Sequence, residues 1–128
     1  MIGFTTNIED ATLKNNNFRQ VLYTGSYLQV VVMSLEAGEE IGEETHEAVD
    51  QFFRIEQGNA KFIVGEVETT VEEDGIFVVP AGSLHNVINV GERQLKLYTI
   101  YAPPNHPDGT THLTKADADK YEAEVHHS

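Results

Sequence analysis

The sequence contains no cysteine and is poor in basic residues. The absence of cysteine excludes disulfides and thiolate metal ligands. Only 8 Lys and Arg residues stand against 21 Asp and Glu residues, which gives a formal net charge of −13. Because binding to nucleic acids and to anionic membranes relies on Lys and Arg, we expect neither kind of partner.

Long hydrophobic runs are also missing. The longest unbroken apolar runs, such as residues 30–33, are far shorter than a membrane span. Residues 1–10 show no basic patch followed by an apolar run, so we expect no secretory signal and a cytoplasmic protein. With 128 residues, 40% of them hydrophobic, the chain is predicted to form one domain around one core.

Short segments rich in β-branched and aromatic residues alternate with glycines through most of the chain. We predict strands over residues 21–24, 27–35, 52–55, 61–64, 66–71, 76–79, 84–90 and 95–101. Strands of this length, separated by turn residues, are typical of an all-β sandwich or barrel. Residues 9–17 are predicted to be a polar arm or loop, and residues 105–111 a polar loop. Thr114 is predicted to cap a short helix over residues 115–125.

Two stretches combine glycine, histidine and polar residues at regular spacing. The first has the pattern Gly38-x5-Glu44-x-His46-x4-Gln51-x6-Gly58. The second has the pattern Gly75-x4-Pro80-x-Gly82-x2-His85-x3-Asn89. Six histidines in an otherwise acidic chain raise the question of a metal site, and two of them, His46 and His85, lie in these patterned stretches.

Together these stretches resemble the two signature motifs of the cupin superfamily, G-x5-H-x-H-x(3,4)-E-x6-G and G-x5-P-x-G-x2-H-x3-N. In the first motif Glu44 replaces the first His and Gln51 replaces the Glu, and in the second the opening Gly75 is one place late. The resemblance covers residues 27–101 and implies an all-β, double-stranded β-helix (jelly-roll) barrel. It implies one cupin domain over residues 1–128, with the barrel over about 18–101 and a loop and helix over 102–128.

The resemblance also implies a divalent metal ion inside the barrel, held by Glu44, His46, Gln51 and His85. Such a set of nitrogen and oxygen donors suits Mn, Fe, Ni or Zn. Simpler interpretations are that His46 lies on a solvated Glu-rich loop, that His85 decorates a turn, or that the metal site has decayed. Because Glu and Gln still offer oxygen donors, we favour an intact site.

Strand alternation tests one ligand independently of the resemblance. Residues two apart face the same side of a strand, so Gln51 shares its side with Phe53 and Ile55, which suit a barrel interior. Asp50 is the better ligand by charge, but it falls on the other side. Alternation therefore favours Gln51, and Asp50 remains the alternative.

His106 and His112 lie in a proline-containing loop after the last predicted strand. The loop can cover the barrel mouth as a lid, or it can be a rigid surface loop shaped by its prolines, and we predict the surface loop. The sequence does not single out a proton-transfer group: Tyr101, His106 and a metal-bound water are the candidates.

The function that follows from the resemblance is that of small single-domain cupins described as mannose-6-phosphate isomerase-like, or of small cupins that linearise unsaturated uronates. We therefore expect a metal-dependent isomerase or lyase of a small sugar-like, keto or uronate compound. The alternatives are an Fe(II)-dependent dioxygenase of a small dicarbonyl and a non-enzymatic small-molecule-binding barrel. The shortage of arginine argues against a phosphorylated sugar. Since similar small cupins pair, we also expect a homodimer.

Overall fold

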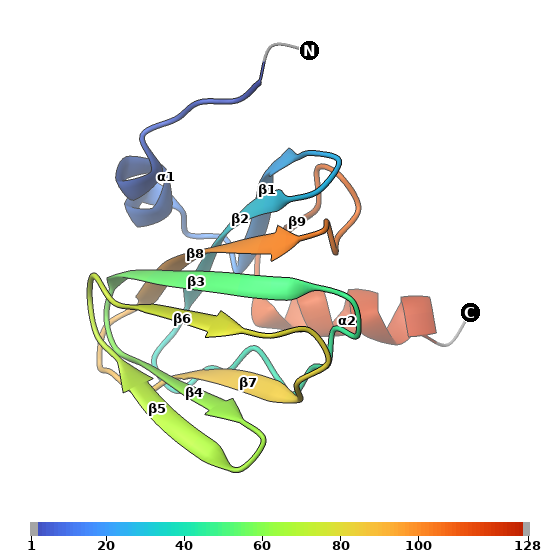
Figure 1. Cartoon of the computed structure of the whole chain (residues 1–128). Helices are drawn as coiled ribbons and strands as arrows, with labels where there is room; N and C mark the ends of the chain where they lie inside the picture. The colour runs from blue at the N-terminus through green and yellow to red at the C-terminus, as the bar shows by residue number, and fades with distance from the viewer. Residues whose placement is uncertain (1–2, 127–128) are drawn as a thin grey trace.

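The structure, a computed structural model, describes residues 3–126 as two antiparallel β-sheets with two helices beside them (Figure 1). The helices are α1 (Ile8–Lys14) and α2 (Lys115–His126). The strands, in chain order, are β1 (Arg19–Thr24), β2 (Gln29–Leu35), β3 (Asp50–Gln57), β4 (Ala60–Val64), β5 (Val67–Val71), β6 (Ile76–Val79), β7 (His85–Asn89), β8 (Leu95–Ala102) and β9 (Thr111–His112). The predicted all-β barrel with a short C-terminal helix is confirmed.

The larger sheet has the order β6-β3-β8-β2-β1-β9 and the smaller sheet has the order β5-β4-β7. Strand β8, the last long strand of the chain, lies between β2 and β3 and pairs with both. Two isolated bridges, Glu40 with Ile88 and Glu44 with His85, fasten the connection between β2 and β3 onto β7. This connection therefore closes one side of the barrel and brings two distant histidine-bearing segments together.

Apolar side chains from both sheets fill the interior. Phe62 of β4 packs edge-on against Phe53 of β3, with ring centroids 5.0 Å apart, and it stacks on Phe77 of β6 at 4.6 Å. Along β3, Gln51, Phe53 and Ile55 are buried while the residues between them are more exposed. The alternation predicted from the sequence is thus present, and it places a polar Gln51 in line with the apolar core.

The structure differs from the sequence prediction near both ends. Residues 9–17 do not form an arm, because helix α1 begins after Asn7, whose side chain accepts a hydrogen bond from the Asp10 amide at 2.9 Å. A helix of 7 residues is too short to show a clear helical period in the sequence. The predicted loop over 105–111 ends in β9, which pairs with β1. A strand of two residues carries no alternation that a sequence could reveal.

Helix α2 confirms the predicted C-terminal helix and helps to shape the site. The Asp117 amide donates to Thr114 Oγ1 at 3.1 Å, so Thr114 caps the helix as predicted. Lys115 Nζ donates to the Ile41 carbonyl oxygen at 3.0 Å. The helix is thereby tied to the connection between β2 and β3, next to the bridge at Glu44.

Strand β2 is buried along nearly its whole length. Its neighbours β1 and β8 and helix α1 belong to the same chain, so its burial requires no second copy. The expected homodimer stays a prediction. No helix within residues 3–126 has the length and apolar character needed to cross a membrane.

Asn89 organises the end of β7. This residue is 1% exposed, and its Nδ2 donates to the carbonyl oxygens of Leu35 at 3.0 Å and Arg93 at 2.9 Å. Its Oδ1 accepts from the Gly91 amide at 2.9 Å. One side chain therefore satisfies three backbone groups, one at the end of β2 and two in the turn between β7 and β8, which explains an amide at this point of the second motif.

We predict that Asn89→Ala lowers the free energy of unfolding by about 2–4 kcal/mol, because it leaves buried backbone groups without partners. Urea denaturation followed by circular dichroism measures the change. The exposed Thr70 on β5 offers a control, and Thr70→Ala should stay within about 0.5 kcal/mol of the parent. Equal stability of Asn89→Ala and Thr70→Ala would show that the Asn89 contacts are not stabilising.

Candidate functional site

The four residues predicted as metal ligands come from three segments that the fold brings together. Glu44 and His46 lie on the connection between β2 and β3, Gln51 lies near the start of β3, and His85 begins β7. The backbones of Glu44 and His85 exchange two hydrogen bonds of 2.9 Å. The rings of His46 and His85 lie 5.4 Å apart between centroids. Residues up to 41 positions apart in the chain (44 to 85) thus meet on one side of the barrel.

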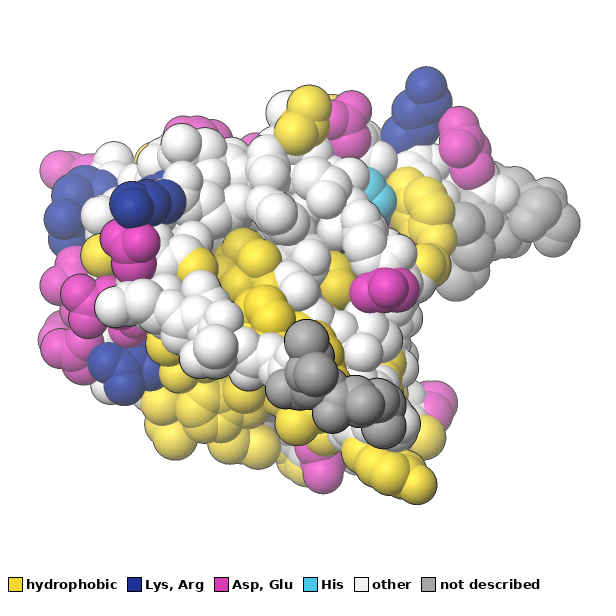
Figure 2. All heavy atoms as spheres, turned by 90° about the horizontal axis from the view of Figure 1, so that it is seen from above, with side chains coloured by type: hydrophobic (Ala, Val, Ile, Leu, Met, Phe, Trp, Pro, Cys, Tyr) yellow, Lys and Arg dark blue, Asp and Glu magenta, His cyan; other side chains and the backbone are white. Residues whose placement is uncertain are grey.

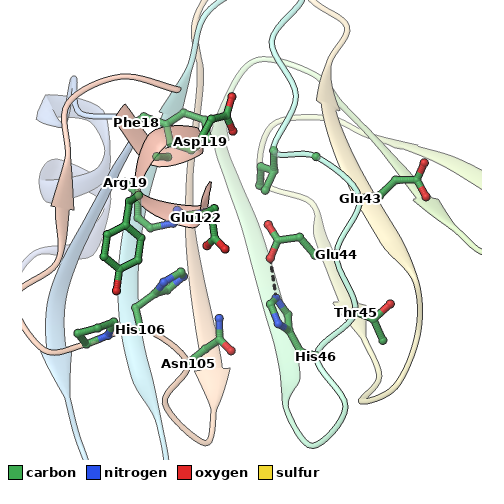
Figure 3. A pocket seen from close by; sticks show the side chains of 15 residues that line it. Phe18, Arg19, Glu43, Glu44, Thr45, His46, Asn105, His106, Asp119 and Glu122 are labelled. Carbon is green, nitrogen blue, oxygen red and sulfur yellow. Dashed lines mark ion pairs between the residues drawn. The ribbon is translucent and has the colours of Figure 1, made fainter. Parts of the chain in front are cut away.

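Glu44 and His46 contact each other directly, as Figure 3 shows. Glu44 Oε2 lies 2.9 Å from His46 Nε2. The two side chains form an ion pair in which the Glu44 carboxylate is the partner of the buried His46 Nε2. Burial alone raises the pKa of the Glu44 carboxyl, but the contact with His46 and the charges of His46, Arg19 and His85 lower it below its ordinary value. The carboxylate is therefore ionised at neutral pH.

Gln51 is 3% exposed and points into the barrel. Its Nε2 donates to Thr99 Oγ1 at 3.0 Å, while its Oε1 is buried without a hydrogen-bond partner. Asp50 is exposed, and its Oδ1 accepts a hydrogen bond from the Ala81 amide at 2.9 Å. Of the two ligand candidates that the sequence left open, Gln51 is the one on the buried side of β3.

His85 is held by its own turn. Its Nδ1 lies 3.0 Å from the carbonyl oxygen of Ser83, which can only accept a hydrogen bond. Nδ1 therefore bears a proton, and in the neutral ring Nε2 is the nitrogen with the lone pair. This is the arrangement that fixes metal-binding histidines in proteins, in which one ring nitrogen donates to a carbonyl and the other binds the ion.

The donors at this place fit a divalent cation by their chemistry. They comprise two imidazole nitrogens, one ionised carboxylate and one amide oxygen, which are ligands for Mn, Fe, Ni or Zn. Gln51 Oε1 is buried and lacks a hydrogen-bond partner, so a cation would satisfy it. Within residues 3–126, no three His, Cys, Asp or Glu side chains already stand in metal-holding positions. The Glu44 carboxylate, now against His46, would have to turn toward a shared point.

Tyr101 and His106 form a second polar pair next to these residues. His106 Nε2 lies 3.2 Å from the Tyr101 hydroxyl, and the Tyr101 ring meets the His46 ring edge-on at 5.8 Å. Burial raises the pKa of Tyr101 well above its ordinary value. Burial, together with the charge of Arg19, lowers the pKa of His106 to about 3. Both side chains are therefore neutral at physiological pH.

The loop that carries His106 lies at the surface, with most of residues 102–110 exposed, but the His106 side chain turns inward toward Tyr101. Gln29 of β2, which is fully buried, anchors the loop at this point. Gln29 Oε1 accepts from the amides of Asn105 at 3.0 Å and His106 at 2.9 Å, and its Nε2 donates to the His106 carbonyl at 2.8 Å. This anchor lies 77 positions away in the sequence, so local pattern could not reveal it.

A pocket of about 630 Å³ opens between this loop, helix α2 and the connection between β2 and β3. Figure 3 shows Glu44 and His46 on one wall and Arg19, Asn105 and His106 on the opposite wall. Its volume suits a small-molecule ligand. Three buried residues of the candidate site do not line this pocket: Gln51, His85 and Tyr101.

Arg19 is the pocket residue that the sequence analysis missed. It is the first residue of β1 and shares the inward side with Val21. The strand predicted from the sequence begins at Val21, so Arg19 falls outside its alternation of buried and exposed residues. A strand extended by two residues would have placed a buried arginine in the barrel.

Residues 31–101 match the Cupin_2 family, described as a cupin domain. The chain is 54% identical over 121 residues to the uncharacterized protein YrkC of Bacillus subtilis strain 168, covering 90% of this chain and 65% of YrkC. It is 41% identical over 110 residues to the uncharacterized protein L612 of Acanthamoeba polyphaga mimivirus, covering 83% of this chain and 69% of L612. The crystal structure of BH2720 from Bacillus halodurans is similar at a TM-score of 0.90 and 48% identity, covering 91% of this chain and 93% of that one.

We predict that Gln29→Ala accelerates hydrogen exchange of the Asn105 and His106 amides by about 5- to 100-fold, because both amides lose their acceptor. Exchange measured by NMR tests this. Gln57→Ala is the matched control, since Gln57 Nε2 donates to the Gln94 carbonyl at 2.9 Å at the other end of β3. Unchanged exchange in Gln29→Ala would mean that the loop is held by other contacts.

Proposed function

The chain belongs to the cupin family, and on that premise we propose that it is a metal-dependent isomerase or lyase acting on a small sugar-like, keto or uronate compound. The observation that carries the proposal is Gln51 Oε1, which is buried without a hydrogen-bond partner in the barrel that also holds the Glu44–His46 ion pair. Buried polar atoms of native proteins normally have partners, and unpaired ones call for an explanation such as an ion.

We propose Glu44, His46, Gln51 and His85 as the residues that hold the metal ion. His85 is already oriented by Ser83, and Gln51 by Thr99. The Glu44 carboxylate balances part of the charge of a divalent cation. When bound, the ion supplies Lewis acidity that polarises a substrate carbonyl.

Tyr101 and His106 are proposed to handle hydrogen bonds and protons of the substrate. The Tyr101 hydroxyl is held by His106 Nε2 at 3.2 Å, and the Tyr101 ring lies edge-on to the ring of His46. A protonated phenol in a buried site stabilises developing negative charge on a substrate oxygen by donating a hydrogen bond. His106, which the loop anchored by Gln29 carries, positions that hydroxyl and closes one wall of the pocket.

The proposed partners are a small-molecule substrate and a second copy of the chain. Apolar side chains gather on one face of the molecule among acidic ones (Figure 2). Ile76 and Val78 of the edge strand β6 are 54% and 52% exposed. We expect light scattering at micromolar concentration to give the mass of a dimer, and a monomer would remove this part of the proposal.

We predict that the parent, purified without a metal-affinity column, holds about one divalent ion per chain. His46→Ala, His85→Ala and Gln51→Ala should each weaken metal affinity by about 100-fold or more, since removal even of outer-shell partners costs 10–100-fold. Elemental analysis and calorimetric titration measure occupancy and affinity. Asp50→Ala is the control, because its carboxylate is exposed and bonds the Ala81 amide, and it should keep the parent affinity.

Loss of metal in Asp50→Ala with retention in Gln51→Ala would overturn this ligand set. Turnover is then assayed on uronates and keto sugars in air and under argon. We expect product formation to persist under argon. Strict dependence on oxygen would replace the isomerase or lyase with the dioxygenase alternative.

A further inference from the structure

Arg19 is a buried arginine on the wall of the pocket (Figure 3). The residue is 3% exposed, its Nη1 lies 3.4 Å from His112 Nδ1, and its guanidinium lies 5.4 Å from the Phe18 ring centroid. Its Nε is buried without a hydrogen-bond partner. A side-chain hydrogen bond also links Arg19 to Tyr101. Arginine is almost never fully buried unless it is paired, so the Nε group, which has no partner, leaves part of its hydrogen-bonding capacity unmet.

The positive charge of Arg19 also lacks a direct counter-ion. Among residues 3–126, no carboxylate forms an ion pair with its guanidinium. Lys115, near the same pocket, is already engaged, because its Nζ contacts the Ile41 carbonyl at 3.0 Å and Asp119 Oδ1 at 2.6 Å. Arg19 therefore keeps a donor group and a charge available to a ligand in the pocket.

We infer that Arg19 binds a carboxylate of the substrate, and that the substrate class is the small hydroxy- or keto-carboxylates, uronates included. The guanidinium presents donors in a planar fork that matches a carboxylate. A phosphate offers similar acceptors but carries more negative charge. Four acidic residues line the same pocket and disfavour the dianion: Glu43, Glu44, Asp119 and Glu122.

The position of Arg19 determines where a bound substrate carboxylate would lie relative to the other pocket residues. Arg19 shares the pocket with Glu44, His46 and His106, and it lies close enough to Tyr101 to affect the hydroxyl electrostatically. A carboxylate on Arg19 therefore leaves the neighbouring carbons of a small substrate facing Glu44 and His46. This last step rests on the proposed function, whereas carboxylate binding itself does not.

The test compares galacturonate with its methyl ester, which has the same ring without the charge. In the unmodified protein, the Arg19 Nε–H resonance in NMR spectra should shift with galacturonate and stay in place with the ester. By calorimetry, Arg19→Lys and Arg19→Met should weaken galacturonate binding by about 10- to 100-fold. Arg93→Met, at an exposed arginine paired with Glu73, should bind as the parent does.

Equal affinity for galacturonate and its ester, or parent-like binding by a folded Arg19→Met, would overturn the inference. Tighter binding of inorganic phosphate than of galacturonate would do the same. If neither Arg19 variant folds, the shift of the Arg19 Nε–H resonance in the unmodified protein is the deciding measurement. The metal content of the same samples separates the two proposals. If the protein holds metal but galacturonate binding does not depend on Arg19, only this inference fails. If galacturonate binding depends on Arg19 but the protein holds no metal, only the metal-dependent function fails.

Discussion

The candidate site depends on the burial of polar side chains inside a small barrel without full hydrogen bonding. Gln51 Oε1 lacks a hydrogen-bond partner, and so does Arg19 Nε on the pocket wall. Each such atom costs about 1–3 kcal/mol relative to a satisfied one. Folding tolerates this cost because the rest of the barrel is well packed around Phe53 and Phe62, both fully buried. The metal ion and the ligand that we propose would supply the missing partners.

The fold supplies the rigidity that these side chains need. Backbone hydrogen bonds between Glu44 and His85 fix the two motif segments against each other. Gln29 fixes the loop of His106 through hydrogen bonds at both ends of its amide. Helix α2 is fixed to the connection between β2 and β3 by Lys115. The walls of the pocket are therefore held by groups outside it, which leaves the groups inside free for a ligand.

Much of this arrangement could be predicted from the sequence because it follows local rules. Alternation along β3 places Gln51 inside and Asp50 outside, and the structure agrees. The inward position of His106 depends on Gln29, far away in the chain, so no local pattern contains it. Arg19 was missed for a different reason, since its strand begins two residues before the apolar run that signals it. Helix α1 is too short for its period to stand out.

Anomalous X-ray diffraction from crystals grown with Mn(II), Fe(II), Ni(II) or Zn(II), recorded at the absorption edge of the added ion, tests the central claim most directly. The account predicts one strong anomalous peak inside the barrel, about 2.0–2.2 Å from the Nε2 atoms of His46 and His85 for Zn(II), with Gln51 Oε1 and the Glu44 carboxylate completing the set. A peak bound elsewhere, or crystals without a peak in the barrel while both imidazoles keep their protein contacts, would contradict it.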